Sequence, residues 1–307
     1  MNELVISVFT GTLIAATPLL LAALGELIVE KSGVLNLGIE GMMLIGAASA
    51  FLVAAHDGGL LAAFVTGALG GAAGAAIFAA LALVFLTNQY AAGLALAIFG
   101  TGVSAMIGAG FGSHPIAGLK PLDLGPLSDL PVLGPLLFRF DIMVYLALAL
   151  VPATWLWLRR SKAGLILRVV GESPENAHAL GYPVRRIRFL AILWGGALAG
   201  LAGAYLSVAY TTIWVENMTA GRGWIALSLV VFATWRPWRV LVGAILFGGV
   251  TILQLHGQIL GLPIPSEALS AAPYVATVIV LVLISQDRAR MALEVPLSLG
   301  RPWRAGS

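Results

Sequence analysis

The sequence predicts an all-α, polytopic integral membrane protein with about nine transmembrane helices (eight to ten), one or two of them broken. The 307 residues are 60% hydrophobic and only 10% charged. Their mean hydropathy is +0.98. Apolar runs recur at close to the ~20 residues that cross a bilayer as a helix. We expect residues 1–307 to form a single transmembrane domain.

Nine apolar segments are expected to be helical. They are residues 4–28, 37–55, 60–86, 90–111, 142–158, 189–213, 224–235, 240–259 and 268–285. The segment 224–235 is too short to cross alone, so it is either a half-helix or continues through Trp238. The first segment begins by Leu4 without a basic stretch before it, which favours a retained span over a cleaved signal.

The longest polar interruption is the loop 159–188. It carries seven of the seventeen Lys and Arg residues, against Glu172 and Glu175. Because cytoplasmic loops hold the excess of Lys and Arg, this loop is expected in the cytoplasm, together with the basic C-terminal tail. The Pro- and Gly-rich segment 112–141 is then external, and either receives a partner protein or is a passive connector. An odd number of crossings places the N-terminus outside, and one re-entrant segment would reverse it.

A short helix with clear boundary signals is predicted inside this loop. Ser173 is a good N-cap, Pro174 fits the first helical position, and Glu175 suits the positive helix end. Gly181 ends the helix and Pro183 prevents its resumption. A capped helix between basic flanks indicates a docking element, and the alternative is an ordinary cytoplasmic loop.

Polar residues also lie at membrane depth in two stretches, 26–46 and 214–224. Such residues usually face a cavity or a partner group, and interrupted helices often mark a transport route. Candidates for lining that route are Asn36, Glu40, Glu216, Asn217, Trp214 and Trp224. The alternative is that Asn36 caps the second helix and Glu40 lies in its first turn, and each Trp also fits an interfacial belt.

Glycines inside the apolar segments follow small-xxx-small spacing. They include Gly67, Gly70, Gly71, Gly74, Gly196, Gly200 and Gly203. Helices in lipid associate by close packing, so these glycines are expected to form packing seams.

Several kinds of site are missing from the sequence. It has no cysteine, and it contains no GxxxxGK[ST], HExxH or GxSxG motif. The four histidines, at positions 56, 114, 178 and 256, are widely scattered. We therefore expect no catalytic residues, no metal and no cofactor. No nucleic-acid partner is expected either, because the basic residues behind the net charge of +3 are concentrated in loops and at the C-terminus.

Four stretches, in the same order, resemble permease subunits of bacterial ABC importers of the nucleoside and simple-sugar group, relatives of the ribose and branched-chain amino acid permeases. They are EKSGVLNLGIEGMMLIGA (30–47), NQYAAGLALAIFGTGVSA (88–105), GLILRVVGESPENAHALGYPVRRIR (164–188) and MTAGRGWIALSLVVFATWRP (218–237). One departure is Asn88-Gln89, where the family favours an acidic residue before the polar one.

The resemblance implies a non-catalytic, multi-pass subunit of the bacterial inner membrane. Its partners would be ABC ATPase subunits, a second and usually non-identical permease subunit, and an extracytoplasmic solute-binding protein. The solute would be a nucleoside, purine nucleosides first, or a simple sugar. The helix that docks the ATPase would comprise Ser173, Pro174, Glu175, Asn176, Ala177, His178, Ala179, Leu180 and Gly181. Two other functions remain open: an ion-gradient-driven secondary transporter, and a membrane enzyme that acts on lipid.

Overall fold

A computed structural model describes residues 2–111, 115–122, 125, 134–259 and 294–304, with isolated positions between 271 and 282. The side chains of 2–5 and 257–259 lie outside that description. The elements are α1 (Asn2–Lys31), α2 (Ile39–Ala55), α3 (Leu60–Ala79), η1 (Ala80–Val84), α4 (Gln89–Gly108), η3 (Gly134–Phe138), α5 (Ile142–Arg160), α6 (Lys162–Glu172), α7 (Pro174–Ala179), α8 (Val184–Tyr205), η4 (Leu206–Tyr210), α9 (Arg222–Phe232) and α10 (Pro237–Ile259).

The all-α prediction is confirmed for this described part of the chain, which contains helices and no strand. Within the described ranges, six helical segments are long and apolar enough to cross a membrane, namely Ile6–Lys31, Leu60–Val84, Gln89–Gly108, Ile142–Arg160, Val184–Tyr210 and Pro237–His256. Two shorter apolar helices, Ile39–Ala55 and Arg222–Phe232, accompany them. The predicted segment 268–285 lies outside the described residues except at isolated positions.

The half-helix interpretation of 224–235 is the correct one of the two. α9 ends at Phe232, and Thr234 and Trp235 follow with positive φ angles of 48° and 53°. α10 then starts at Pro237, so no continuous helix runs through Trp238. At 1.5 Å per residue, the 11 residues of α9 span about 16 Å, roughly half of a bilayer core.

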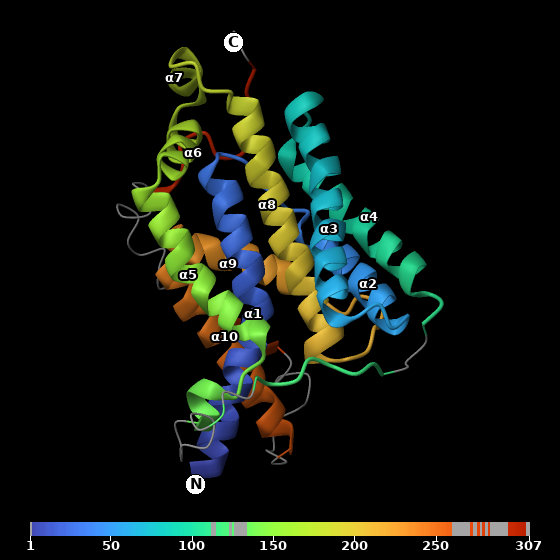
Figure 1. Cartoon of the computed structure of the whole chain (residues 1–307). Coiled ribbons are helices and arrows are strands. Elements are labelled where there is room, and N and C mark those ends of the chain that lie inside the picture. Colours follow the sequence, from blue (N-terminus) through green and yellow to red (C-terminus); the bar gives the residue numbers. More distant parts are fainter. Residues whose placement is uncertain are drawn as a thin grey trace.

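α1 is the central helix of the bundle, and α5, α8, α9 and α10 pack around it (Figure 1). Its residues Leu21, Ala22, Ala23 and Leu24 are fully buried. Its last turns also carry Glu26 and Glu30, which are 1% and 0% exposed. Carboxylates at membrane depth face protein and not lipid, which explains why this segment lies in the interior.

The glycine seams are confirmed between α2, α3 and α8. A Cβ added at Gly71 would overlap the carbonyl of Gly196, and one at Gly200 would overlap the carbonyl of Gly67. Gly46 of α2 is equally close to the backbone of Gly200. Without side chains at these points, the three backbones approach closely enough for extensive van der Waals contact.

The chain ends and the loop helices define two ends of the bundle. The N-terminus lies at one end, and α6, α7 and the C-terminus lie at the other (Figure 1). α6 was not expected as a separate helix, although Ser161 caps it by accepting a hydrogen bond from Gly164 N at 2.9 Å. In the segment 112–141, the part 115–122 is irregular and is held by bonds from Ile116 N to Thr212 O and from Leu122 N to Phe140 O.

Candidate functional site

Two helices start inside the bundle and meet at the carboxylate of Glu40. One oxygen, Oε1, accepts hydrogen bonds from Thr219 Oγ1 at 2.5 Å and from Gly221 N at 2.8 Å. The other, Oε2, accepts one from Gly223 N at 2.6 Å. The first N–H groups of a helix have no partner within the helix, and the helix dipole favours a negative charge there. Glu40, in the first turn of α2, therefore caps the N-terminus of α9.

Glycine makes this close approach possible. Gly221 has a φ of +82°, in the left-handed region that L side chains avoid. At Gly223, a Cβ would lie 2.6 to 2.7 Å from the Oε2, Cα and N atoms of Glu40. The MTAGRG stretch thus brings the start of α9 directly onto α2.

Asn36 forms the turn that leads into α2. Its backbone N–H donates to Glu26 Oε1 at 3.2 Å, and its Oδ1 accepts from Gly38 N at 3.0 Å. Because Glu26 is five residues before the end of α1, this bond places Asn36 about 7 Å inside that end. The chain leaves α1, turns back into the bundle, and starts α2 there.

The six predicted path residues do not form one cluster. Asn36 and Glu40 are 1% and 6% exposed, and both are bonded within the chain. Trp214 is buried against Gly108, at the end of α4. By contrast, the side chains of Glu216, Asn217 and Trp224 are exposed. Contact of any of these residues with solute stays a prediction.

A cavity of about 190 Å³ lies beside the start of α9, between α1, η4 and α10. Its polar lining side chains are Tyr210, Arg222, Thr251 and Gln254. None of the six predicted path residues lines it. Arg222 is an ionisable residue at membrane depth, which is the sequence signal that points to this cavity.

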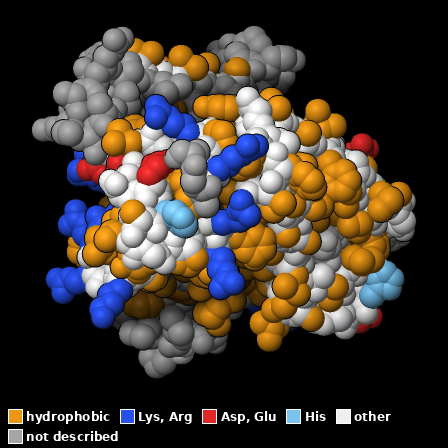
Figure 2. Space-filling model, turned by 90° about the horizontal axis from the view of Figure 1, so that it is seen from above, with side chains coloured by type: hydrophobic (Ala, Val, Ile, Leu, Met, Phe, Trp, Pro, Cys, Tyr) orange, Lys and Arg blue, Asp and Glu red, His pale blue; other side chains and the backbone are white. Residues whose placement is uncertain are grey.

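α7 has the capped geometry that its sequence predicts. Ser173 Oγ accepts a hydrogen bond from Asn176 N at 3.3 Å, and Gly181 has a φ of +86°. Pro174 and Ala177 are buried, and Ala177 packs with Val170 and Val184. The remaining face of the helix and its end are exposed, namely Glu175, Asn176, His178, Ala179, Leu180 and Gly181. Seen from this end, Lys and Arg side chains stand around the bundle, with few carboxylates between them (Figure 2).

Arg188 is a structural residue that the sequence did not distinguish from its basic neighbours. It is 1% exposed, and its Nε donates to Ser32 O at 3.1 Å, in the turn after α1. Its Nη2 donates to Ser298 Oγ at 2.9 Å, and its Nη1 to Arg301 O at 3.4 Å. Ser298 Oγ in turn donates to Gly171 O at 2.6 Å, near the end of α6. One guanidinium thus joins α8, the α1–α2 turn and the segment 294–304.

The comparison with known proteins agrees with this architecture. Residues 8–285 match the family described as branched-chain amino acid transport system / permease component. The chain is 43% identical to TsgC13 of Haloferax volcanii, provisionally named a glucose ABC transporter permease protein, over 94% of each chain.

Two further relatives are named for nucleosides. The guanosine ABC transporter permease protein NupQ of Bacillus subtilis is 32% identical, covering 95% of this chain and 96% of its own. The nucleoside ABC transporter permease protein NupC of Lactococcus lactis subsp. cremoris is 31% identical, covering 90% of this chain and 91% of its own. The chain is a multi-pass membrane protein and belongs to the permease-component family of branched-chain amino acid transport systems.

Proposed function

We propose that this permease subunit forms the translocation path of an ATP-driven importer for a simple sugar or a nucleoside. The observation that carries the proposal is the exposed, capped helix α7 at the basic end of a chain that has no P-loop. Relatives named for glucose, guanosine and nucleosides support the solute class, because all these solutes present the hydroxyls of a sugar ring.

The ATPase is a separate protein that docks on α7. Ser173, Pro174 and Ala177 hold the helix in place, while Glu175, His178 and Leu180 offer an exposed surface. With α7 in the cytoplasm, the N-terminus at the opposite end lies outside. A solute-binding protein delivers solute at that outer end, and a second permease subunit completes the path.

Transmission from the motor follows contacts within the chain. α7 packs through Ala177 on Val184, at the start of α8. One turn later, Arg188 holds the carbonyl of Ser32, between α1 and α2. α2 in turn is fixed to the start of α9 through Glu40. A push on α7 therefore reaches the two short helices at membrane depth, whose shift relative to the long helices opens the path to one side and then to the other.

Solute passes between the permease subunits and beside the start of α9. The cavity lined by Tyr210, Arg222 and Thr251 supplies hydrogen-bonding groups for hydroxyls. Asn36 and Glu40 are buried in the present conformation. We propose that they act indirectly, by holding the starts of α2 and α9 in place beside this cavity.

Uptake of radiolabelled glucose, ribose, guanosine and uridine tests the proposal. The chain is expressed with its neighbouring transport genes, with and without a substitution of the P-loop lysine of the ATPase. Uptake of one solute class that disappears with the ATPase substitution is the expected result. Uptake that survives this substitution and stops when the ion gradient is collapsed would show a secondary transporter instead.

A further inference from the structure

A second cavity, of about 430 Å³, opens at the α7 end of the bundle and shares no lining residue with the first. It lies where α1 and α5 end, beside α6, the α9–α10 turn and the segment 294–304. Its volume is within the range of small-ligand sites. Its charged lining residues are Lys31, Arg159, Arg168, Arg236, Arg239 and Glu294.

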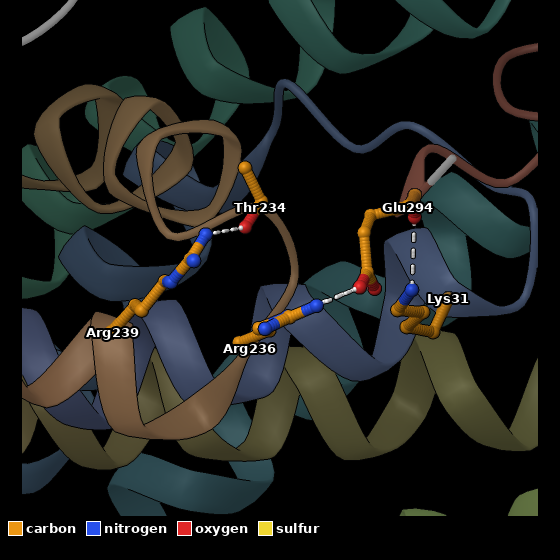
Figure 3. Close-up of polar contacts among 5 residues, drawn as sticks. All are labelled: Lys31, Thr234, Arg236, Arg239 and Glu294. Atoms are coloured by element: carbon orange, nitrogen blue, oxygen red, sulfur yellow. Dashed lines mark hydrogen bonds and ion pairs between the residues drawn. The ribbon is translucent and has the colours of Figure 1, made fainter. Parts of the chain in front are cut away.

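The positive charge of this cavity is only partly neutralised. Glu294 forms an ion pair with Arg236, and its backbone carbonyl accepts a hydrogen bond from Lys31 Nζ at 3.0 Å (Figure 3). Arg239 donates to the neutral hydroxyl of Thr234. Glu294 is the one carboxylate among the described lining residues, against five cations.

Two arginines in particular lack an acidic partner in the described ranges. Arg168 Nε is buried and has no hydrogen-bond acceptor there. The Arg159 guanidinium lies over the ring of Trp155 at 5.2 Å, and no ion pair joins it to a described carboxylate. A buried donor without an acceptor is costly, so a group that accepts from it stabilises the site. Guanidinium groups match phosphate oxygens in geometry and charge.

The position of the cavity indicates where such a phosphate comes from. Lys31 and Arg159 stand at the last turns of α1 and α5, where these helices leave the membrane. Trp155, Trp235 and Trp238 also line the cavity, and Trp238 is 48% exposed. Tryptophan is enriched at the level of lipid headgroups, and basic pockets between helices on the cytoplasmic side bind acidic headgroups. We propose that this cavity binds the phosphate group of an anionic phospholipid of the cytoplasmic leaflet.

The test uses the full-length chain purified in detergent and native mass spectrometry with titrated lipid. Phosphatidylglycerol is compared with phosphatidylcholine, which has the same phosphate but no net charge. We expect at least tenfold tighter binding of phosphatidylglycerol. The double variant Arg159→Gln/Arg168→Gln should weaken the binding of phosphatidylglycerol by about 25-fold, because each cation near the membrane surface contributes about fivefold to the affinity. If the double variant does not fold, Arg159→Gln alone, at an exposed position, should give about a fivefold loss.

The matched control is Arg185→Gln/Arg186→Gln, which removes the same charge from exposed positions outside the cavity. It should leave the lipid preference within about twofold, because these exposed side chains do not line the cavity and solvent screens their charge. Competition by soluble glycerol 3-phosphate distinguishes the phosphate of a lipid headgroup from that of a free, soluble ligand. Absence of competition supports the lipid, and displacement at millimolar concentration assigns the site to a free phosphate ligand and overturns the lipid. Equal binding of both lipids, or an equal loss in the control, overturns the site itself.

Discussion

The carboxylate of Glu40 and the backbone N–H of Gly223 lie 2.6 Å apart, although the two residues are 183 positions apart in the sequence. This contact joins the first turns of two short helices inside the bundle. It fixes the depth at which α2 and α9 begin. The contact therefore couples the two short apolar helices, neither of which is long enough to count as a full membrane span.

Replacing Glu40 with Gln should therefore lower stability and uptake together. The amide keeps the shape of the side chain but loses the charge that the α9 N-terminus favours, at a cost of about 1–3 kcal/mol. Thermal unfolding in detergent and uptake in cells are the two measurements. Asp57→Asn, at an exposed position just after α2, removes the same charge outside the candidate path and the docking helix; it is the control and should change neither. Loss of uptake with full stability and assembly would assign Glu40 to solute contact.

The glycine seam predicts a position-dependent effect of alanine. Gly200→Ala places a methyl group against the backbone of Gly67 and Gly71, and should cost about 1–3 kcal/mol by overpacking. Gly102→Ala, on α4, meets no atom within 4 Å and should be neutral or stabilise by up to about 1 kcal/mol. The unfolding temperatures of the two variants compare them directly. Equal temperatures would show that the helices adjust freely at the seam.

Removal of the Arg188 guanidinium should release the segment 294–304. Arg188→Gln loses the bonds to Ser32, Ser298 and Arg301, and should destabilise this end of the bundle by about 2–3 kcal/mol. Trypsin digestion in detergent measures the release as faster cleavage after Arg304, because Pro302 blocks cleavage after Arg301. The exposed Arg185→Gln is the matched control. Unchanged cleavage in Arg188→Gln would show that the segment is held by other contacts.

The surface of α7 can be tested by removing its helical structure. A Gly-Ser run in place of residues 175–179 should leave membrane insertion intact, because the long apolar helices are untouched. It should abolish copurification of the ATPase, because a flexible segment has no ordered face to dock and adds an entropic cost. An ATPase that still copurifies and drives uptake would contradict the docking assignment.

Local signals were sufficient for much of this architecture. The apolar runs predicted the helices, Ser173, Pro174 and Gly181 predicted the ends of α7, and the small-residue spacing predicted the seam between α3 and α8. Each of these follows from residues within one or two helical turns of one another. α6 was missed even though Ser161 caps it. Its 11 residues lie inside the basic loop 159–188 and are too few to be noticed as a membrane-spanning apolar run.

Long-range contacts could not be predicted in this way. Nothing near Glu40 in sequence shows that its partners are Thr219, Gly221 and Gly223. Arg188 has the same local setting as the exposed Arg185, and its burial depends on Ser298, 110 positions away. The two cavities likewise combine residues from four or more separate elements.

The central claim is that α7 docks the motor, and a single cysteine tests it most directly because the chain contains none of its own. Ala179→Cys lies on the exposed end of α7, and His56→Cys lies at an exposed site just after α2. Each variant is assembled with a form of the ATPase that carries engineered surface cysteines, and the complex is treated with a short bifunctional thiol crosslinker. Crosslinking from position 179 and none from position 56 is the predicted result. No crosslink from position 179 in a complex that still transports solute would contradict the account.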